Sequence, residues 1–418
     1  SACAFDCASE IELDWCNNHT EESCVHNYLF SVSHFQRKLD EYYLRGGRPP
    51  IAEAIFLTRL PRDFQLYFLD AGCPWPLILA YVFVAEFRLW VEEDSENYIR
   101  IAFELARNLG PDQTWLLQES GTWPYNAAIK SYEATLQRVS QLSQRPAPSV
   151  HFVICHCRED LSWLAEDLKH VPEGSILVVY EKCGEMADVQ HLRVAAGGPF
   201  AEVFVIPRPD AGTIRGDECS GYLSHVTANW HQLADYTLFL HSDPGEHAHF
   251  SFLHTVLKAL KKRTYDVSFQ SINGPRHVRT VTPCLQAVHQ VLFGSPMPGL
   301  VGPYCCAQFV ASREAIMARP RELYDRALQL VDGSVAPMDV CRTATPRSAH
   351  CYALEFLWHV LFGAEYDPPL RQDDKTLPLP FRVKYGFEPE MKEWSKVLLA
   401  PPVPKKVIER KDFSKMVG

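Results

Sequence analysis

The stretch VHFVICHCREDLSWLAEDL at residues 150–168 decides how the larger part of this chain folds. Its first six residues, 150–155, are a short apolar run, and an amphipathic segment follows at 161–168. A short apolar run next to a segment with helical periodicity predicts a buried strand followed by a helix.

The same alternation continues downstream. Further strand candidates are SILVVY at 175–180, AEVFVI at 201–206 and DYTLFL at 235–240, and the pattern at 221–233 predicts a helix. Short apolar strands that alternate with helices predict an α/β domain, here residues 146–375, with a mostly parallel sheet covered on both faces. Ligands of such sheets bind beyond the carboxyl ends of the strands. Residues directly after each strand are therefore the candidates for chemistry.

Residues 1–145 have a different pattern and are expected to form a cysteine-containing, mainly helical domain. Segments with helical spacing lie at 30–39, 99–109 and 127–142, and the linker SQRPAPS at 143–149 follows them. The longest apolar run, LILAYVFVA at 77–85, is far shorter than the roughly 20 residues of a membrane-spanning helix. We interpret it as a buried core helix and expect no transmembrane segment.

The last part of the chain, residues 376–418, is rich in proline and ends with several basic residues. It is expected to form an extended arm. Either this arm or the N-terminal domain could contact a protein partner. Over the whole chain of 418 residues the net charge is −10, so we expect no general attraction to nucleic acid.

The cysteines indicate an oxidising compartment. Four of the 14 cysteines lie within the first 24 residues, at positions 3, 7, 16 and 24. Short segments with this density of cysteines usually depend on disulfides, and the spacing lacks the paired C-x-x-C of a zinc site. Asn18 begins an Asn-His-Thr triplet, which is an N-glycosylation acceptor. The secretory pathway lumen (ER or Golgi) or the extracellular space is therefore the expected location.

The densest group of reactive side chains is HSDPGEHAH at 241–249, directly after the strand candidate DYTLFL. A divalent ion that carries a diphosphate needs one or two carboxylate or imidazole ligands on a short turn. His241, Asp243 and His247 are the candidate metal ligands. The simpler alternative is a polar loop whose histidines bond to nearby backbone.

Two more groups follow or precede predicted elements. Arg215 is a candidate for a phosphate contact, while Asp217 and Glu218 either bind sugar hydroxyls or serve as first-turn acids of a helix. After the first strand, Glu159 and Asp160 either face a nucleotide or cap the next helix. The neighbouring Cys-His-Cys at 155–157 is not expected to share one metal, because alternation along a strand points His156 away from the two cysteines.

A predicted amphipathic helix carries the last candidate. Glu355 and His359 are four residues apart and so share one helix face. Glu355 can act as a general base, or the pair can form a buried structural hydrogen bond. The motifs G-x-S-x-G, G-x-x-x-x-G-K-[ST], G-x-G-x-x-G and H-E-x-x-H are all absent from the sequence.

The order of these segments resembles a eukaryotic family called domain of unknown function 3431, over about residues 150–370. The resemblance lies in CREDLSWL at 157–164, SILVVYEKCG at 175–184, the block from 216 to 247, the segment 302–328 and ALEFLWHVLFG at 353–363. That family is similar to nucleotide-sugar glycosyltransferases of the GT-A type. The resemblance implies a Rossmann-like sheet, a lumenal or secreted location, and sugar transfer assisted by a divalent metal, Mn or Mg.

Carried over by position, Asp243 with His241 or His247 stands where the metal-binding D-x-D motif of these transferases lies, and Glu355 is the candidate base. Two departures weaken the match. His241 occupies the first position of D-x-D, and Asp217 stands where the family has an arginine.

Two functions follow from the sequence. The first is a lumenal glycosyltransferase whose partners are a nucleotide sugar and a glycan or protein acceptor. The second is a non-catalytic secreted or lumenal protein that keeps the transferase scaffold as a structural or interaction module. A metallohydrolase is a third possibility, because a His/Asp cluster that binds metal can also activate water.

Overall fold

The computed structural model describes residues 32–59, 75–108 and 124–382, apart from short gaps at 93, 185, 195–196, 211–214, 275, 305, 337 and 342–348. Asn18 and the four N-terminal cysteines lie outside the described residues, as does the arm beyond residue 382. The chain divides into two compact units. One holds the described parts of Ser1–Ala85 and Glu96–Lys130, and the other holds those of Glu86–Ser95 and Ser131–Tyr385.

The described residues of the N-terminal part form helices. They are α3 (Val32–Arg45), α4 (Ile51–Arg59), α6 (Trp75–Val91), α7 (Ser95–Arg107) and α9 (Pro124–Ser143). The apolar run at 77–85 lies in α6, and all nine of its side chains are buried. It is the core helix that its composition predicted. Among the described helices, none combines the length and the apolar character needed to cross a membrane.

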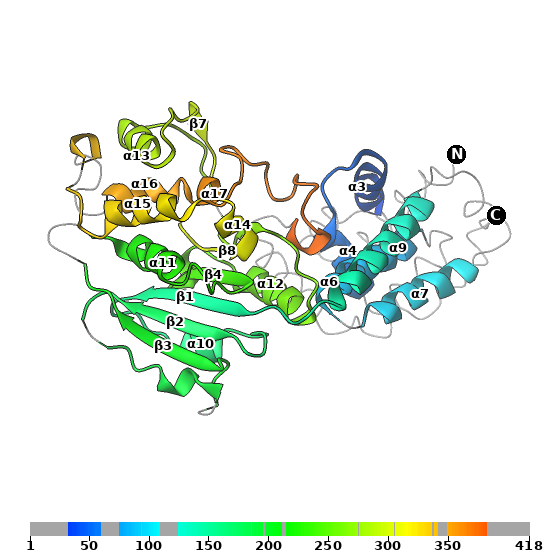
Figure 1. The fold of residues 1–418 in the computed structure, drawn as a ribbon. Coiled ribbons are helices and arrows are strands. Elements are labelled where there is room, and N and C mark those ends of the chain that lie inside the picture. Colours follow the sequence, from blue (N-terminus) through cyan, green and yellow to red (C-terminus); the bar gives the residue numbers. More distant parts are fainter. Residues whose placement is uncertain are drawn as a thin grey trace, which may run out of the picture. The chain divides into compact units, whose positions relative to one another are not determined.

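The second unit is built on a six-stranded sheet of order β3-β2-β1-β4-β8-β5 (Figure 1). Its strands are β1 (Val150–His156), β2 (Ile176–Glu181), β3 (Glu202–Pro207), β4 (Tyr236–His241), β5 (Phe269–Ser271) and β8 (Phe309–Ser312). The first four pair in parallel, and β8 pairs antiparallel with both β4 and β5. The predicted α/β class with a mostly parallel sheet is therefore confirmed.

The remaining elements surround this sheet and add a small two-stranded one. The helices are α10 (Trp163–Glu166), α11 (Asp217–Ala228), α12 (Phe250–Lys262), α13 (Pro283–Phe293), α14 (Arg313–Met317), α15 (Arg321–Val331), α16 (Ala349–Glu355) and α17 (Trp358–Leu361). The short helices η1 (Gln190–Leu192), η3 (Pro244–Glu246), η4 (Asp339–Cys341) and η5 (Leu379–Phe381) and the paired strands β6 (Arg279–Thr280) and β7 (Leu300–Val301) complete them.

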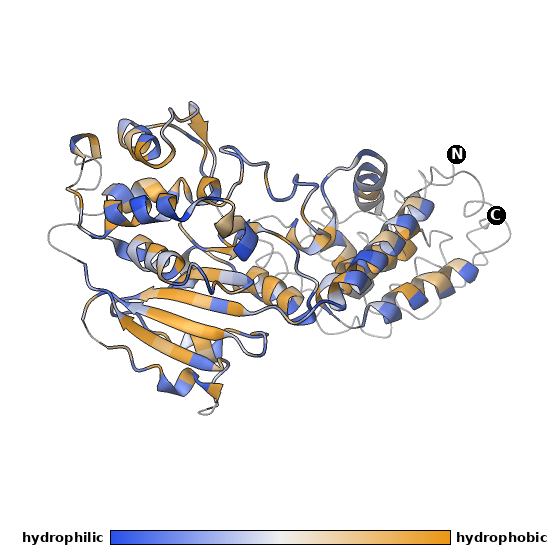
Figure 2. Cartoon of the chain, in the orientation of Figure 1, coloured by the Kyte–Doolittle hydropathy of each residue, from blue (hydrophilic) through white to orange (hydrophobic). Residues whose placement is uncertain are grey.

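The central strands are apolar along their length because both faces of the sheet are covered. Figure 2 shows β1, β2 and β3 as largely hydrophobic ribbons. Alternate side chains of β1, such as Val153 and Cys155, point to one face and pack with α11. On the other face Phe152 packs edge-on against the Phe200 ring. On the side of α11 away from the sheet lie α15 and α16 (Figure 1).

Two predicted boundaries need correction. The helix expected at 221–233 instead spans Asp217–Ala228, since the two acids at its start form its first turn and Asn229 ends it. In the predicted C-terminal arm, described residues 376–382 include η5, whose Phe381 is fully buried and packs on the Tyr265 ring. This part of the arm belongs to the body of the unit.

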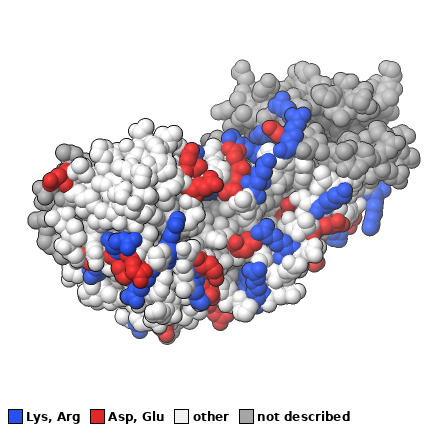
Figure 3. Space-filling model, turned by 45° about the horizontal axis from the view of Figure 1, so that its top comes forward, with Lys and Arg blue, Asp and Glu red and all other residues white. Residues whose placement is uncertain are grey.

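The surface charge is mixed. On the face in Figure 3, basic and acidic side chains of the described residues alternate in small groups. On this face the described residues therefore form no continuous basic stripe of the kind that binds nucleic acid.

A close approach between α11 and β1 requires glycine at position 221. A Cβ there would lie 2.2 Å from Cys155 Sγ and 3.0 Å from Tyr180 Cβ. We expect Gly221→Ala to lower the free energy of unfolding by about 1–3 kcal/mol through overpacking, measured by urea denaturation. In a Cys155→Ala background the loss should be smaller. The control is Gly245→Ala, whose Cβ would be 3.7 Å from its nearest neighbour; equal losses at both glycines would contradict the packing argument.

Candidate active site

The carboxyl ends of three central strands meet at one edge of the sheet. β1 ends at His156, β2 at Glu181 and β4 at His241. The chain leaves β1 towards β2 and β3 on one side and returns to β4 on the other. The gap between β1 and β4 is therefore the topological switch point, where open α/β sheets bind ligands.

The loop after β1 is fixed by its own polar contacts. His156 Nδ1 lies 2.7 Å from Glu181 Oε2, and its Nε2 lies 2.9 Å from the Glu159 carbonyl oxygen. A disulfide between Cys157 and Cys183 joins this loop to the one after β2. The expectation that Cys155, His156 and Cys157 do not share a metal therefore agrees with these contacts.

Glu159 and Asp160 both accept bonds within this loop. Glu159 Oε2 accepts from the backbone N–H groups of Cys157 and Arg158 at 2.7 and 3.0 Å. Burial opposes ionisation, but these bonds and one with Ser242 hold the pKa of Glu159 below its usual value. Asp160 accepts from the N–H and hydroxyl of Ser162, the residue before α10, so it fixes the turn into this helix without capping its first turn.

The histidines after β4 lie at the switch point. The backbone N–H of His241 donates to Gln308 Oε1. Its Nε2 is buried and has no hydrogen-bond partner among the described residues. Burial, with the nearby His247, lowers the pKa of His241 to about 4, so the ring is neutral at pH 7. The ring centroids of His241 and His247 are 6.2 Å apart, and Asp243 is exposed at the start of η3.

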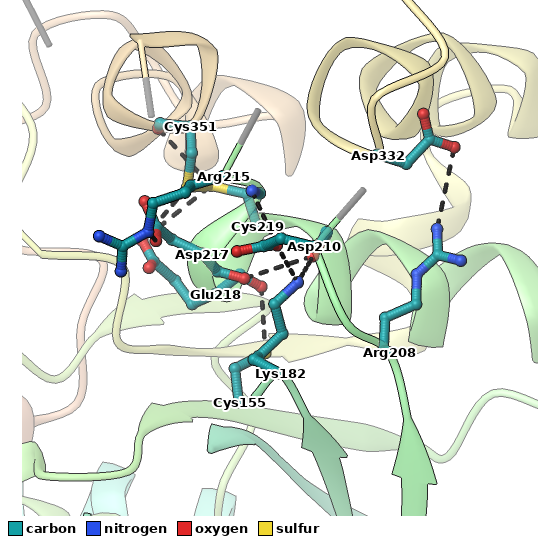
Figure 4. Close-up of polar contacts among 12 residues, drawn as sticks. Cys155, Lys182, Arg208, Asp210, Arg215, Asp217, Glu218, Cys219, Asp332 and Cys351 are labelled. Carbon is teal, nitrogen blue, oxygen red and sulfur yellow. Dashed lines mark hydrogen bonds and ion pairs between the residues drawn. A yellow bond between two sulfur atoms is a disulfide. The ribbon is translucent and has the colours of Figure 1, made fainter. Parts of the chain in front are cut away.

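A second group lies where α11 meets α16; we call Asp217, Glu218 and Glu355 the carboxylate cluster. α11 supplies the first two and the last residue of α16 supplies the third. A disulfide between Cys219 and Cys351 joins the two helices (Figure 4). The structure thus brings together three candidates from distant parts of the sequence.

Two carboxyl groups of the carboxylate cluster have pKa values above the ordinary value for glutamate. Burial and then the neighbouring Glu355 raise the pKa of Glu218 to about 8. Burial and then Asp217 raise the pKa of Glu355 to about 7, although Arg279 opposes the shift. Asp217 also has a positive φ of 40°, a backbone strain that proteins tend to keep at functional sites. The cluster therefore holds acids that exchange protons near neutral pH.

Basic side chains stand beside these acids. Lys182 follows β2, and its Nζ lies 2.6 Å from Asp210 Oδ1 and 2.5 Å from Ser220 Oγ (Figure 4). Its charge lowers the pKa of Glu218 and so partly offsets the burial. Arg215 is largely exposed, with Nε 3.3 Å from Asp217 Oδ1. Lys182 was not among the predicted site residues, although it lies directly after a strand, where candidates for chemistry are expected.

Three residues near the carboxylate cluster have side chains of the kinds that bind metal ions. Among the described residues, potential ligand atoms of Glu218, Cys219 and Cys351 lie within 4.8 Å of one another. The two cysteines form a disulfide, and thiolates are what bind metal. In this group the two cysteines therefore form a disulfide cross-link between α11 and α16 and do not form a metal centre.

A cavity of about 120 Å³ lies beside the carboxylate cluster. Glu355 and Gln308 both line it, and Gln308 also accepts the bond from His241. Other lining residues are Gln270, Tyr304, Trp358, His359 and Arg371. Gln308 thus connects the cavity to the carboxyl end of β4.

Comparison with known families identifies one match. A family model described as Protein of unknown function (DUF3431) matches residues 268–373. The matched stretch contains the cavity residues from β5 to α17, including Glu355, and is shorter than the resemblance at 150–370. No curated protein and no solved structure matches the chain.

Proposed function

We propose that the α/β unit is a glycosyltransferase-like enzyme that moves a sugar from a nucleotide sugar to an acceptor hydroxyl, with Glu355 as the base. One observation carries the proposal. The Glu355 carboxyl has a pKa of about 7 and lines a cavity at the sheet's carboxyl edge. A general base works best when its pKa lies near the operating pH.

The proposed step uses this carboxylate directly. The acceptor hydroxyl gives its proton to Glu355 while its oxygen forms a bond to the anomeric carbon of the donor sugar. The bond from that carbon to the diphosphate oxygen breaks, and the nucleoside diphosphate leaves with the electron pair. Arg215, which is largely exposed, is the proposed contact for the diphosphate.

His241, Asp243 and His247 would hold the divalent metal, Mn or Mg. The buried, unpartnered Nε2 of His241 supports this assignment among the described residues, because a neutral imidazole nitrogen is a metal ligand. A bound metal would supply positive charge for the departing diphosphate. Asp217 and Glu218 are proposed contacts for sugar or ribose hydroxyls, and Glu159 and Asp160 for the nucleotide side of the site.

The second candidate is a non-catalytic lumenal or secreted protein that keeps this scaffold. One observation favours it: Glu159 and Asp160 are already engaged within their own loop. Either candidate is proposed to reside in the secretory pathway lumen or outside the cell. Three disulfides that join described cysteines support this location.

A thermal-shift experiment tests the proposed function. With Mn²⁺ and a matching nucleoside diphosphate at 100 times its Kd, we expect the Tm to rise by about 3–5 °C. Asp243→Ala should abolish the metal-dependent part of the rise. Asp167→Ala, an exposed aspartate at the end of α10, is the matched control and should keep it. Absence of a rise with every nucleoside diphosphate would contradict the transferase proposal.

A further inference from the structure

The cavity next to Glu355 is lined by buried polar residues whose hydrogen-bonding capacity the protein does not use. Gln270, Trp358 and His359 are only 4%, 3% and 5% exposed. Among the described residues, no partner bonds to either amide atom of Gln270, to Trp358 Nε1 or to His359 Nδ1. Unpaired buried groups cost about 1–3 kcal/mol each, so a cavity with several of them indicates a polar occupant.

The unpartnered groups determine which hydrogen-bond donors and acceptors a ligand of this cavity must have. His359 Nε2 lies 3.1 Å from the Tyr366 carbonyl oxygen, to which it donates. Nδ1 of the neutral ring is then an acceptor. The Trp358 indole is a donor, and the Gln270 amide is both donor and acceptor. A ligand with several hydroxyl groups meets all of these requirements, because each hydroxyl both donates and accepts.

Charge in the cavity works against an anionic ligand. Among the described lining residues the arginine is Arg371, which donates from Nη2 to the carbonyl oxygens of Ser271 and Asn273. The guanidinium also lies over the Phe252 and Tyr304 rings. The other charged lining residues are the acids Glu355 and Asp374. An uncharged ligand is therefore favoured over a phosphate or carboxylate.

The volume and the apolar lining of the cavity further limit which ligands it can bind. Phe269, Phe309 and Tyr304 contribute aromatic side chains to the wall. Small-molecule sites usually combine such a wall with a few polar groups, but in about 300–1,000 Å³. At about 120 Å³, this cavity is smaller than those sites, so a single sugar ring matches its size better than a whole nucleotide sugar does.

We propose that this cavity binds one uncharged, hydroxyl-rich sugar ring, and that the ring is the terminal unit of the acceptor. Its hydroxyl then lies at Glu355, so this inference deepens the proposed function and rests on it for the reaction, but not for the binding. The chemical class is a neutral glycan end rather than an acidic one.

The test measures equilibrium binding to the full chain by isothermal titration calorimetry. The probes are methyl glycosides of glucose, galactose, mannose and N-acetylglucosamine, each compared with glucuronic acid. We expect at least one neutral glycoside to bind at least tenfold more tightly than the acid. Gln270→Leu and Trp358→Phe each remove unpartnered donors at similar size, and each should weaken binding about fivefold to tenfold. Gln290→Leu, on the exposed face of α13, is the control and should bind as wild type.

The outcomes separate this inference from the proposed function. Glycoside binding without any nucleotide shift would overturn the transferase proposal and leave a sugar-binding cavity. A nucleotide shift without glycoside binding would overturn the cavity inference alone. Equal binding of the neutral glycosides and glucuronic acid, or unchanged binding in both cavity variants, would also overturn it. Urea denaturation of each variant establishes that it is folded.

Discussion

Replacing Glu355 with glutamine is expected to lower the rate of sugar transfer by a factor of about 10²–10⁴, the usual contribution of a general base. Glutamine keeps the size and the polar character of the side chain but cannot take a proton from the acceptor. Binding of the nucleoside diphosphate should not change, because the metal ligands proposed here lie after β4. Transfer to the best glycoside acceptor is the measurement.

The pH dependence of transfer provides a second readout. Glu355 must be ionised to act, and its pKa is raised to about 7. The rate should therefore rise with pH up to about 7 and then level off. Asp217→Asn removes a negative charge that raises this pKa, so it should move the rising limb to lower pH. A profile that does not respond to Asp217→Asn, or an E355Q variant with wild-type rate, would contradict the role of Glu355 as base.

Stability measurements test whether unfolding, rather than loss of the base, lowers the transfer rate of E355Q. A carboxyl with a raised pKa in the folded state binds protons that the unfolded chain has released. Its contribution to the free energy of unfolding is therefore complete below the ordinary value of 4.5 and is lost as pH rises through about 7. Glutamine does not titrate, so E355Q should lose less stability than wild type between these pH values.

Loss of the Cys219–Cys351 disulfide is expected to have the largest effect on stability. The two cysteines are 132 residues apart, and the chain-entropy model gives about 5 kcal/mol for closing such a loop. The double variant C219A/C351A should lose much of this free energy of unfolding, measured in urea. It should also lose most transfer activity, because this bond joins the helices that carry Glu218 and Glu355.

The Cys157–Cys183 disulfide offers a matched comparison. It closes a loop of only 26 residues, for which the same model gives about 3.5 kcal/mol. C157A/C183A should therefore be less destabilised than C219A/C351A. It keeps the Cys219–Cys351 disulfide, which joins the helices of the carboxylate cluster. A larger loss in C157A/C183A than in C219A/C351A would contradict this account of the longer bridge.

Four of the six strands of the sheet, β1 to β4, were predictable to within one residue. β1, β2 and β4 are buried along most of their length, so nearly every position selects an apolar side chain. The edge strand β3 is more exposed but also has an apolar run, which made it recognisable in the sequence. β5 and β8 have only three and four residues, which is too short for a periodic signal. The antiparallel position of β8 between β4 and β5 was therefore not predicted.

The site was predictable in part, for a different reason. His241, Asp243, Glu159 and Glu218 follow strands or begin a helix, and local sequence shows such positions. Proximity of Glu355 to Glu218 depends on the pairing of Cys219 with Cys351, which cysteine positions alone do not specify. The unpartnered groups of Gln270, Trp358 and His359 depend on packing between distant segments, for which the sequence has no local pattern.

The long disulfide also has a consequence for how the protein is made. A ribosome adds about 5–20 residues per second, so Cys351 emerges roughly 7–26 s after Cys219. During that interval Cys157 and Cys183, which precede it in the sequence, are available as wrong partners. Glu355 follows Cys351, so the carboxylate cluster is completed only after Cys351 has been made. Production of active protein should therefore depend on an oxidising compartment with a disulfide isomerase that releases early mispaired forms.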